Sequence, residues 1–380
     1  LSRGFHMPAR QAILPAGPAW PAAMNPRLPD PLAPQTLERA LALPAAFYLG
    51  EAMAARDRTA VFAHSWQLVG HESVLADAGD HVVADIAGLP IVVIRDTQGR
   101  LRAFHNVCRH RAGPLATCDG KGAKALRCKY HGWTYGLDGV LRSAPEMQTA
   151  EDFDMASVRL PELRVETWQG LVFVAGDGAV PFAEFSRGLD DPLRGLSPRD
   201  FVFHKRFRYE VACNWKVYCD NYLEGYHVPH IHPGLNSLLD YRQYVTAAGD
   251  WFSYQYSPLQ SDDGLYGDGD AVYYFIYPNT MLNLLPGRLQ TNRVLPLGPE
   301  RCLVEFDYYY AASDSAGAEA RKQADHDFAH QVQAEDITIC EHVQRGLASG
   351  SYLPGRLNPL RENAVFHYHE LLRRAYREIR

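Results

Sequence analysis

The feature that most constrains this chain is the stretch CRHRAGPLATCDGKGAKALRCKYHGW, residues 108–133. It carries two mixed pairs of metal-ligand residues, Cys108 with His110 and Cys128 with His131. Turn-forming residues accompany both pairs, as expected of ligand loops at hairpin tips. Zinc motifs usually group cysteine with cysteine and histidine with histidine, whereas here each loop supplies one sulfur and one nitrogen. A structural zinc site, the first alternative, is therefore disfavoured.

The spacing C-x-H followed by C-x₂-H resembles the Rieske [2Fe–2S] motif. In that motif one iron keeps two thiolates, and the other binds two neutral imidazoles, which raises the reduction potential above that of an all-cysteine cluster. The resemblance implies that Cys108 and Cys128 bind one iron. It implies that His110 and His131 bind the other.

The same loops indicate which Rieske branch the chain resembles. Respiratory Rieske proteins place an extra cysteine in each loop and join the two in a disulfide. Cys118 could be one member, but Lys129 and Tyr130 stand between the ligands of the second loop. Without that disulfide, the resemblance is to the oxygenase and ferredoxin branch, and Cys118 is expected to be a free or partly buried thiol.

Length, composition and charge limit the remaining classes. The 380 residues suffice for two domains, and 47% hydrophobic with 22% charged residues is typical of a folded chain. A formal net charge of -6 argues against a nucleic-acid partner, since such proteins normally carry a basic patch. No run of about 18 apolar residues predicts a membrane span. Seven cysteines without small-scaffold spacing favour a reducing compartment, so the predicted location is the cytoplasm.

Changes in residue pattern predict four segments. Residues 1–34 form a Pro-rich tail without the apolar core of a signal peptide, and Met7 is a candidate natural start. Residues 35–65 have helical spacing interrupted by proline, which predicts two short helices as a lead-in. Residues 66–176 contain short β-like runs and predict an all-β domain. Residues 177–380 predict an antiparallel sheet with packed helices, so the fold class is α+β.

A second group of ligand residues lies in DNYLEGYHVPHIHPGL, residues 220–235. Residues five apart on an α-helix point about 140° apart around its axis, so His227 and His232 converge only if a helix ends between them. Pro229 is expected to supply that break. A helix beginning near Trp215 would then end at His227 and leave His232 in a loop.

A carboxylate is needed to complete a 2-His-1-carboxylate triad of the non-haem Fe(II) oxygenases. The helical stretch QAEDITICEHVQRGL supplies Glu335 and Asp336. The H-x₄-H pair and this distant acid resemble the catalytic domain of Rieske oxygenase α-subunits, and the resemblance covers nearly the whole chain after residue 40. It implies a helix-grip-like second domain in which His227, His232 and Asp336 bind Fe(II). Glu335 is the less favoured alternative.

Glu224 stands three residues before His227, where the family carries an acid that links the mononuclear iron to a Rieske cluster. Ring-dihydroxylating members have aspartate there. The family forms homotrimers in which the cluster of one chain lies next to the mononuclear iron of its neighbour. The resemblance therefore implies that Glu224 joins His227 to a cluster histidine of a neighbouring subunit. The alternative is an exposed helix acid. Asp220 and Asn221 are weaker candidates for the surroundings of the iron.

The segments NWKVYCDNYLEGYHVPHIHPGL and EDITICEHVQRGLASGSYLPGR look most like the choline monooxygenase-like branch, which includes betaine-demethylating enzymes. This implies a terminal oxygenase that uses O₂ to hydroxylate or N-demethylate a small quaternary ammonium compound. Aromatic faces bind such cations. Candidate cage residues, none of them assigned, are Trp251, Tyr254, Tyr256, Tyr273, Phe275 and Tyr277. An aromatic-ring substrate is the alternative, and composition does not separate the two.

The source of electrons has no signature in this chain. No G-x-G-x-x-G fingerprint precedes a helix, so a separate NAD(P)H-dependent reductase with flavin or iron–sulfur groups is implied. A non-catalytic Rieske electron carrier is the remaining class of function. A carrier needs only the first domain, whereas here a second domain follows with its own ligand set.

Overall fold

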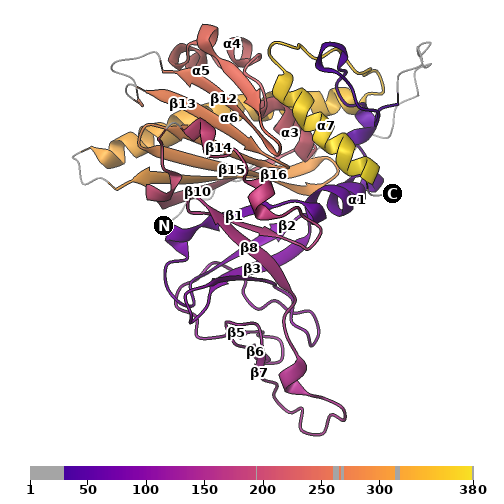
Figure 1. Cartoon of the computed structure of the whole chain (residues 1–380), viewed down its shortest axis with the longest axis vertical. Coiled ribbons are helices and arrows are strands. Elements are labelled where there is room, and N and C mark those ends of the chain that lie inside the picture. The colour runs from indigo at the N-terminus through magenta and orange to yellow at the C-terminus, as the bar shows by residue number, and fades with distance from the viewer. Residues whose placement is uncertain (1–29, 194, 260–264, 267–268, 313–316, 379–380) are drawn as a thin grey trace, which may run out of the picture.

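The computed structural model describes residues 30–193, 195–259, 265–266, 269–312 and 317–378. Two large antiparallel sheets make up most of it, and a small third sheet forms the lower end (Figure 1). Most of the predicted tail, residues 1–29, lies outside the described residues. No helix in the described part of the chain is long and apolar enough to span a membrane.

The lead-in contains less helix than its spacing predicts. The first predicted helix is reduced to the 3-10 turn η1, Leu37–Arg39. Leu41 pairs instead with Arg356 in an isolated β-bridge, so tertiary pairing overrides the local pattern. The second predicted helix exists as α1, Glu51–Arg56. It continues as a π-helical segment, η3, Asp57–Val61, and ends in a 3-10 turn, η4, Phe62–His64.

The first domain is all-β, as predicted. Its main sheet has the order β1-β9-β8-β4-β3-β2, and a smaller sheet has the order β5-β6-β7. The strands of the main sheet are β1 Gln67–His71, β2 His81–Ile86, β3 Leu89–Arg95, β4 Leu101–His105, β8 Glu162–Trp168 and β9 Leu171–Ala175. The strands of the smaller sheet are β5 Leu126–Arg127, β6 Thr134–Tyr135 and β7 Leu141–Ser143. The smaller sheet lies at the end of the molecule farthest from α4 and α5 (Figure 1).

The second domain is a sheet of order β10-β16-β15-β14-β13-β12-β11 with packed helices, and the α+β prediction is confirmed. Its strands are β10 Phe201–Val211, β11 Val245–Ala248, β12 Phe252–Pro258, β13 Asp270–Ile276, β14 Thr280–Leu285, β15 Arg288–Gly298 and β16 Arg301–Ala311. Its α-helices are α2 Phe182–Phe185, α3 Trp215–Tyr222, α4 Val228–Ile231, α5 Pro233–Leu238, α6 Ala318–Ala348 and α7 Asn363–Glu378. The predicted division after residue 176 falls between β9 and α2.

The seven-stranded sheet has two apolar faces. One packs against α3, α6 and α7 in a core that includes Trp215 and Tyr368. The other packs against β1 and β9 of the first domain through residues such as Phe173 and Tyr274. Arg293 of β15 also donates to the Leu68 carbonyl at 3.2 Å. The first domain is therefore anchored on the sheet face opposite the helices.

The helix predicted from Trp215 to His227 is shorter than expected. Asn214 caps α3 by accepting from the Lys216 amide at 3.0 Å, and the helix ends at Tyr222. Pro229 does not break a helix; it stands in the first turn of α4, where proline lacks no hydrogen bond and has a suitable φ. His227 immediately precedes α4, and His232 immediately follows it.

Candidate metal centres

The two cysteine-histidine loops share one backbone geometry. In each, the cysteine N–H donates to the carbonyl five residues later, and the cysteine carbonyl accepts from the N–H four residues later. The donor-acceptor pairs are Cys108 to Gly113 at 2.8 Å, Ala112 to Cys108 at 3.0 Å, Cys128 to Trp133 at 2.9 Å and Gly132 to Cys128 at 3.0 Å. Only the second loop is a hairpin tip, between β5 and β6. The first is not, because β4 and β5 belong to different sheets.

The four predicted cluster side chains meet at the tip. Cys108 and Cys128 are buried, and burial together with the neighbouring Cys108 raises the pKa of the Cys128 thiol. The rings of His110 and His131 lie 4.6 Å apart at 76°, with His131 exposed. Nδ1 of His110 is buried and has no hydrogen-bond partner in the described part of the chain. One pair of buried thiols and one pair of neighbouring imidazoles, with the buried Nδ1 of His110 unpartnered, suit the donor set of a Rieske cluster.

Close packing surrounds these ligands. A Cβ added at Gly113 would lie 2.8 Å from the Cys128 sulfur, so a side chain at this position would displace the thiol. The Trp133 ring stacks on His110 at 4.8 Å and 9°. Tyr135 Oη lies 3.3 Å from the Cys108 sulfur, and burial raises the pKa of Tyr135, which keeps the phenol as a donor. Sequence reasoning missed Tyr135 because a buried strand tyrosine has no distinguishing pattern. Cys118 is free, as expected, but exposed rather than partly buried.

The second group of ligand residues converges around α4 and α6. Nε2 of His232 lies 3.0 Å from Oδ1 of Asp336, and Nε2 of His227 lies 3.9 Å from the same oxygen. One potential ligand atom from each of these three residues lies within 4.8 Å of the others. Two imidazoles and one carboxylate are the donor set that suits a mononuclear non-haem Fe(II).

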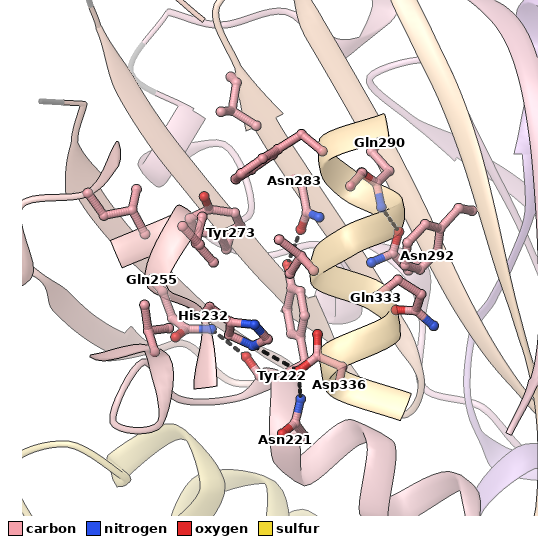
Figure 2. Close-up of a pocket in the computed structure, with 18 of the residues that line it drawn as sticks. Asn221, Tyr222, His232, Gln255, Tyr273, Asn283, Gln290, Asn292, Gln333 and Asp336 are labelled. Atoms are coloured by element: carbon pink, nitrogen blue, oxygen red, sulfur yellow. Dashed lines mark hydrogen bonds and ion pairs between the residues drawn. The ribbon is translucent and has the colours of Figure 1, made fainter. Parts of the chain in front are cut away.

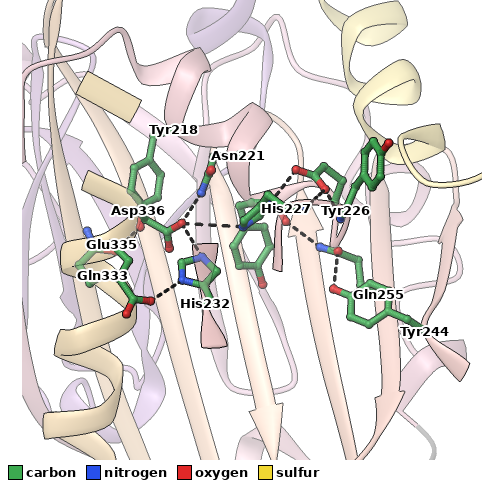
Figure 3. A network of polar contacts seen from close by, with 12 residues as sticks. Tyr218, Asn221, Tyr226, His227, His232, Tyr244, Gln255, Gln333, Glu335 and Asp336 are labelled. Atoms are coloured by element: carbon green, nitrogen blue, oxygen red, sulfur yellow. Dashed lines mark hydrogen bonds and ion pairs between the residues drawn. The ribbon is translucent and has the colours of Figure 1, made fainter. Parts of the chain in front are cut away.

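Nδ1 of each histidine, the ring nitrogen that does not face Asp336, also contacts a carboxylate. Glu224 Oε1 lies 2.6 Å from Nδ1 of His227. Glu335 Oε2 lies 2.7 Å from Nδ1 of His232, as Figure 3 shows. These contacts hold the Nδ1 proton and turn each Nε2 toward Asp336. Glu335, the less favoured alternative ligand, thus lies behind His232 and not among the converging atoms.

Two further contacts set the electrostatics of this group. Asn221 donates to Asp336 Oδ1 at 2.6 Å, so the weaker candidate Asn221 does lie beside the triad. Burial disfavours charge on His232, but hydrogen bonds and charge from Asp336 and Glu335 raise its pKa overall. Asp220 faces away, where it accepts from Tyr48 at 2.6 Å and from His369 at 2.9 Å.

A cavity adjoins the triad between the sheet and α6 (Figure 2). Its aromatic lining is Tyr218, Tyr222, Tyr244, Tyr266, Tyr273, Phe306 and Phe328. Of the six candidate cage residues, only Tyr273 is among them. Phe275 follows Tyr273 on the same face of β13 but lies under α7, with its ring 5.0 Å from Tyr368. Tyr254 and Tyr256 pack toward the first domain. Strand alternation alone could not separate these environments.

The chain matches known families in both halves. A Rieske [2Fe-2S] domain model matches residues 65–163, and a model of the ring hydroxylating alpha subunit catalytic domain matches residues 198–378. The chloroplastic choline monooxygenase of Arabidopsis thaliana is 35% identical, over 97% of this chain and 89% of that protein. The carnitine monooxygenase oxygenase subunit of Escherichia coli K12 is 31% identical, over 90% and 95% of the two chains.

Solved structures agree with these matches. The quaternary ammonium Rieske monooxygenase CntA in complex with L-carnitine aligns with a TM-score of 0.79 at 28% identity, covering 89% of this chain and 96% of that chain. Naphthalene 1,2-dioxygenase with indole bound aligns at 0.74 but only 18% identity, over 90% and 94%, and shares the fold. The predicted cofactor classes, a Rieske cluster and a mononuclear iron, are those of the two matched domains. The chain belongs to the Rieske non-haem iron oxygenases, a family of oxidoreductases, and is homologous to its quaternary ammonium monooxygenases.

Proposed function

We propose that this protein is the terminal oxygenase of a system that hydroxylates or N-demethylates a small quaternary ammonium compound of the choline, betaine or proline-betaine type. The observation that carries the proposal is the convergence of His227, His232 and Asp336 beside a cavity lined by aromatic rings. When bound, the cluster at the tip would supply electrons and the mononuclear iron would activate O₂.

The cavity wall supports a cationic substrate. Tyrosine and phenylalanine faces attract a quaternary ammonium group most strongly where water is excluded. The rings of Tyr218 and Tyr222 come from α3, which also supplies Asn221 beside the triad. A methyl group on nitrogen held among these rings would thus lie next to the ligand atoms. The aromatic-ring alternative is weaker, because the dioxygenase likeness concerns the fold alone.

The protein's own residues would fix the geometry of the iron ligands. Glu224 and Glu335 retain the Nδ1 protons of the two histidines, so that both Nε2 atoms remain free to bind metal. Asn221 orients Asp336 through one oxygen. We propose His227, His232 and Asp336 as the ligands of this iron. For the cluster we propose Cys108, His110, Cys128 and His131, in domains divided at residues 176 and 177.

We also propose that electrons pass between subunits of a homotrimer. Within one chain, the β5–β7 sheet and α4 lie at opposite ends of the molecule (Figure 1), which disfavours transfer inside a single chain. Glu224 lines the triad cavity and also a second cavity on the other side of α3, together with Asp220, Glu362 and His369. A neighbouring tip seated there would bring a cluster histidine to Glu224. Inter-subunit electron transfer is described for the related carnitine-oxidising enzyme.

The remaining partners follow from this assignment. A separate NAD(P)H-dependent reductase would deliver electrons, O₂ and the ammonium compound would be the substrates, and the proposed location is the cytoplasm. Every cysteine of the described chain is free, which is consistent with a reducing compartment.

Oxygen consumption tests the proposal directly. Anaerobically reconstituted protein is mixed with a compatible reductase, NADH and either betaines and choline or planar aromatic acids, and air is then admitted. Substrate-dependent O₂ uptake with an ammonium compound, accompanied by a hydroxylated or demethylated product, is expected. Absence of uptake with every compound would contradict an oxygenase. Uptake with the aromatic acids alone would contradict the substrate class.

A further inference from the structure

A cluster of polar side chains extends along the cavity wall from the end remote from the triad. It consists of Arg288, Gln290 and Asn292 on β15 and Asn283 on β14, and we call it the donor cluster. Residues 288, 290 and 292 alternate along a strand and therefore share one face of the sheet. Asn283 is the register partner of Gln290. Figure 2 shows Gln290 toward the top of the view, Asn292 below it at mid height, and His232 with Asp336 toward the bottom.

Helix α6 gives the length of the space between these ends. Its cavity-lining residues run from Phe328 to Asp336, eight positions that correspond to about 12 Å of helix rise. Asp325, one turn before Phe328, accepts from Arg288 Nε at 2.7 Å. A ligand that reaches from the triad to Arg288 is therefore elongated rather than compact.

Arg288 has donor capacity to spare. It is 5% exposed, its guanidinium donates to Asp325 and, through Nη2, to Gln290, and it also lies against the Tyr308 ring. Nη1 donates no hydrogen bond within the described part of the chain, although an arginine has five N–H groups. Asp325 needs no second bond from Arg288, because Tyr266 also donates to it at 2.7 Å and Tyr310 at 2.5 Å. Burial opposes the charge on Arg288, but Asp325 and the adjacent tyrosines raise its pKa, so it stays cationic.

The neighbouring amides have their oxygens occupied and their N–H₂ groups free. Asn292 Oδ1 accepts from Gln290 at 2.7 Å, and Asn283 Oδ1 accepts from Tyr222 at 2.6 Å. Neither Nδ2 atom donates a hydrogen bond within the described residues. The donor cluster thus offers N–H groups and one positive charge, which matches an anionic acceptor and not a second cation.

We infer that the donor cluster is a carboxylate subsite, and that the substrate is a zwitterion with a quaternary ammonium group at one end and a carboxylate at the other. This inference rests on the proposed function, which places the ammonium group among the aromatic rings beside the triad. Arg288 Nη1 and the amide of Asn283 would bind the carboxylate. An alcohol such as choline would offer these cavity-facing donors no anionic acceptor, so it would gain none of the charge-assisted hydrogen bonds.

Calorimetry with the purified, iron-loaded protein under anaerobic conditions tests the subsite without turnover. The ligands are trimethylammonio carboxylates with one to five methylene groups, their primary amides, and choline. The best carboxylate is expected to bind about tenfold or more tightly than its own amide, because a charge-assisted hydrogen bond replaces a neutral one. Equal binding of carboxylate and amide at every chain length would overturn the subsite and leave the proposed function intact.

A paired substitution identifies the residue responsible. Removing Arg288 alone would leave Asp325 buried without its partner, so the test variant is the double Arg288→Gln/Asp325→Asn. It is expected to lose the preference for carboxylate over amide while it still binds the amides. Arg301→Gln, at an exposed arginine paired with Glu210, is the matched control and should keep the preference. A double variant that keeps the preference would overturn the role of Arg288.

The two hypotheses fail in different ways. If no trimethylammonio ligand binds the wild-type protein, the proposed function is wrong and the inference falls with it. If these ligands bind but the carboxylate gives no advantage, only the inference is wrong. The wild-type series decides this even if the double variant does not fold.

Discussion

The two candidate metal centres of this protein are built in different ways. The tip holds four candidate ligand residues within residues 108–133, on two loops whose own backbone bonds have the same pattern. The second centre joins His232 to Asp336 across 104 positions of sequence, and it exists only because α6 packs beside α3. A site of the first kind is set by local backbone geometry, whereas a site of the second kind depends on tertiary packing.

The largest effect should come from replacing a residue of the second centre. His227→Ala removes one imidazole from the triad and is expected to abolish turnover while the spectrum of the tip cluster remains unchanged, because the tip is built independently. Oxygen uptake and electron paramagnetic resonance of the same sample measure both properties. Loss of the cluster signal together with activity would contradict the independence of the two centres.

His110→Cys makes the converse test at the tip. A third thiolate should lower the reduction potential by on the order of 200 mV or more and remove the Rieske signal, while the fold persists because His110 is only half-buried. Redox titration and electron paramagnetic resonance measure these changes. An unchanged signal would eliminate His110 as a ligand.

Glu224→Gln tests the proposed connection between the centres. The amide still hydrogen-bonds His227, so both metals and substrate binding should persist, whereas electron delivery should slow by orders of magnitude. Stopped-flow reoxidation of the reduced cluster measures that step. Co-expression of His131→Ala with His227→Ala chains adds a second readout, since mixed trimers should regain some activity. Inactive mixed trimers, verified by mass, would mean that electrons travel within one chain.

Gly113→Ala probes how tightly the tip is packed. The added methyl would approach the Cys128 sulfur at 2.8 Å, so cluster content should fall while iron at the second centre remains. Gly298→Ala is the control, because nothing lies within 4 Å of the position that its added methyl group would take. Labile sulfide per chain measures the effect, and equal sulfide in both variants would contradict the close approach.

The smallest effect concerns the junction between the two regions. His71 of β1 packs its ring 5.2 Å from Tyr309 of β16, and burial lowers its pKa to about 4. The folded state therefore binds fewer protons than the unfolded state, and stability should fall as pH drops from about 6.5 to 4, by up to about 3 kcal/mol. Melting midpoints measured from pH 7 to pH 4.5 should fall less in His71→Gln than in wild type. Parallel curves would contradict this contribution.

The contrast between a locally built centre and one assembled by tertiary packing also explains how much of each could be predicted from the sequence. The mixed Cys–His spacing is a local pattern, so all four tip residues could be picked out from the sequence, although their roles came from the resemblance to the Rieske motif. The structure brings the two histidine rings together. His227, His232 and Asp336 also meet, but their prediction needed a family resemblance. The helix prediction behind it was wrong in detail, since Pro229 begins a helix instead of ending one.

The cavity beside the triad was the region least predictable from the sequence. Aromatic residues occupy strands for packing reasons alone, so sequence could not separate Tyr273 in the cavity from Phe275 under α7. The role proposed for Arg288 depends on its pairing with Asp325 and on donors left free by neighbouring amides. Such contacts arise only when β15 and α6 are assembled.

The iron and sulfide content of purified protein tests the central claim most directly. Two independently built centres predict about three iron atoms and two labile sulfides per chain in the wild type, and about two of each in Asp336→Ala. The cluster signal should be the same in both proteins. A wild type that holds only two iron atoms after anaerobic loading with Fe(II), or an Asp336→Ala variant that loses sulfide along with iron, would contradict the account.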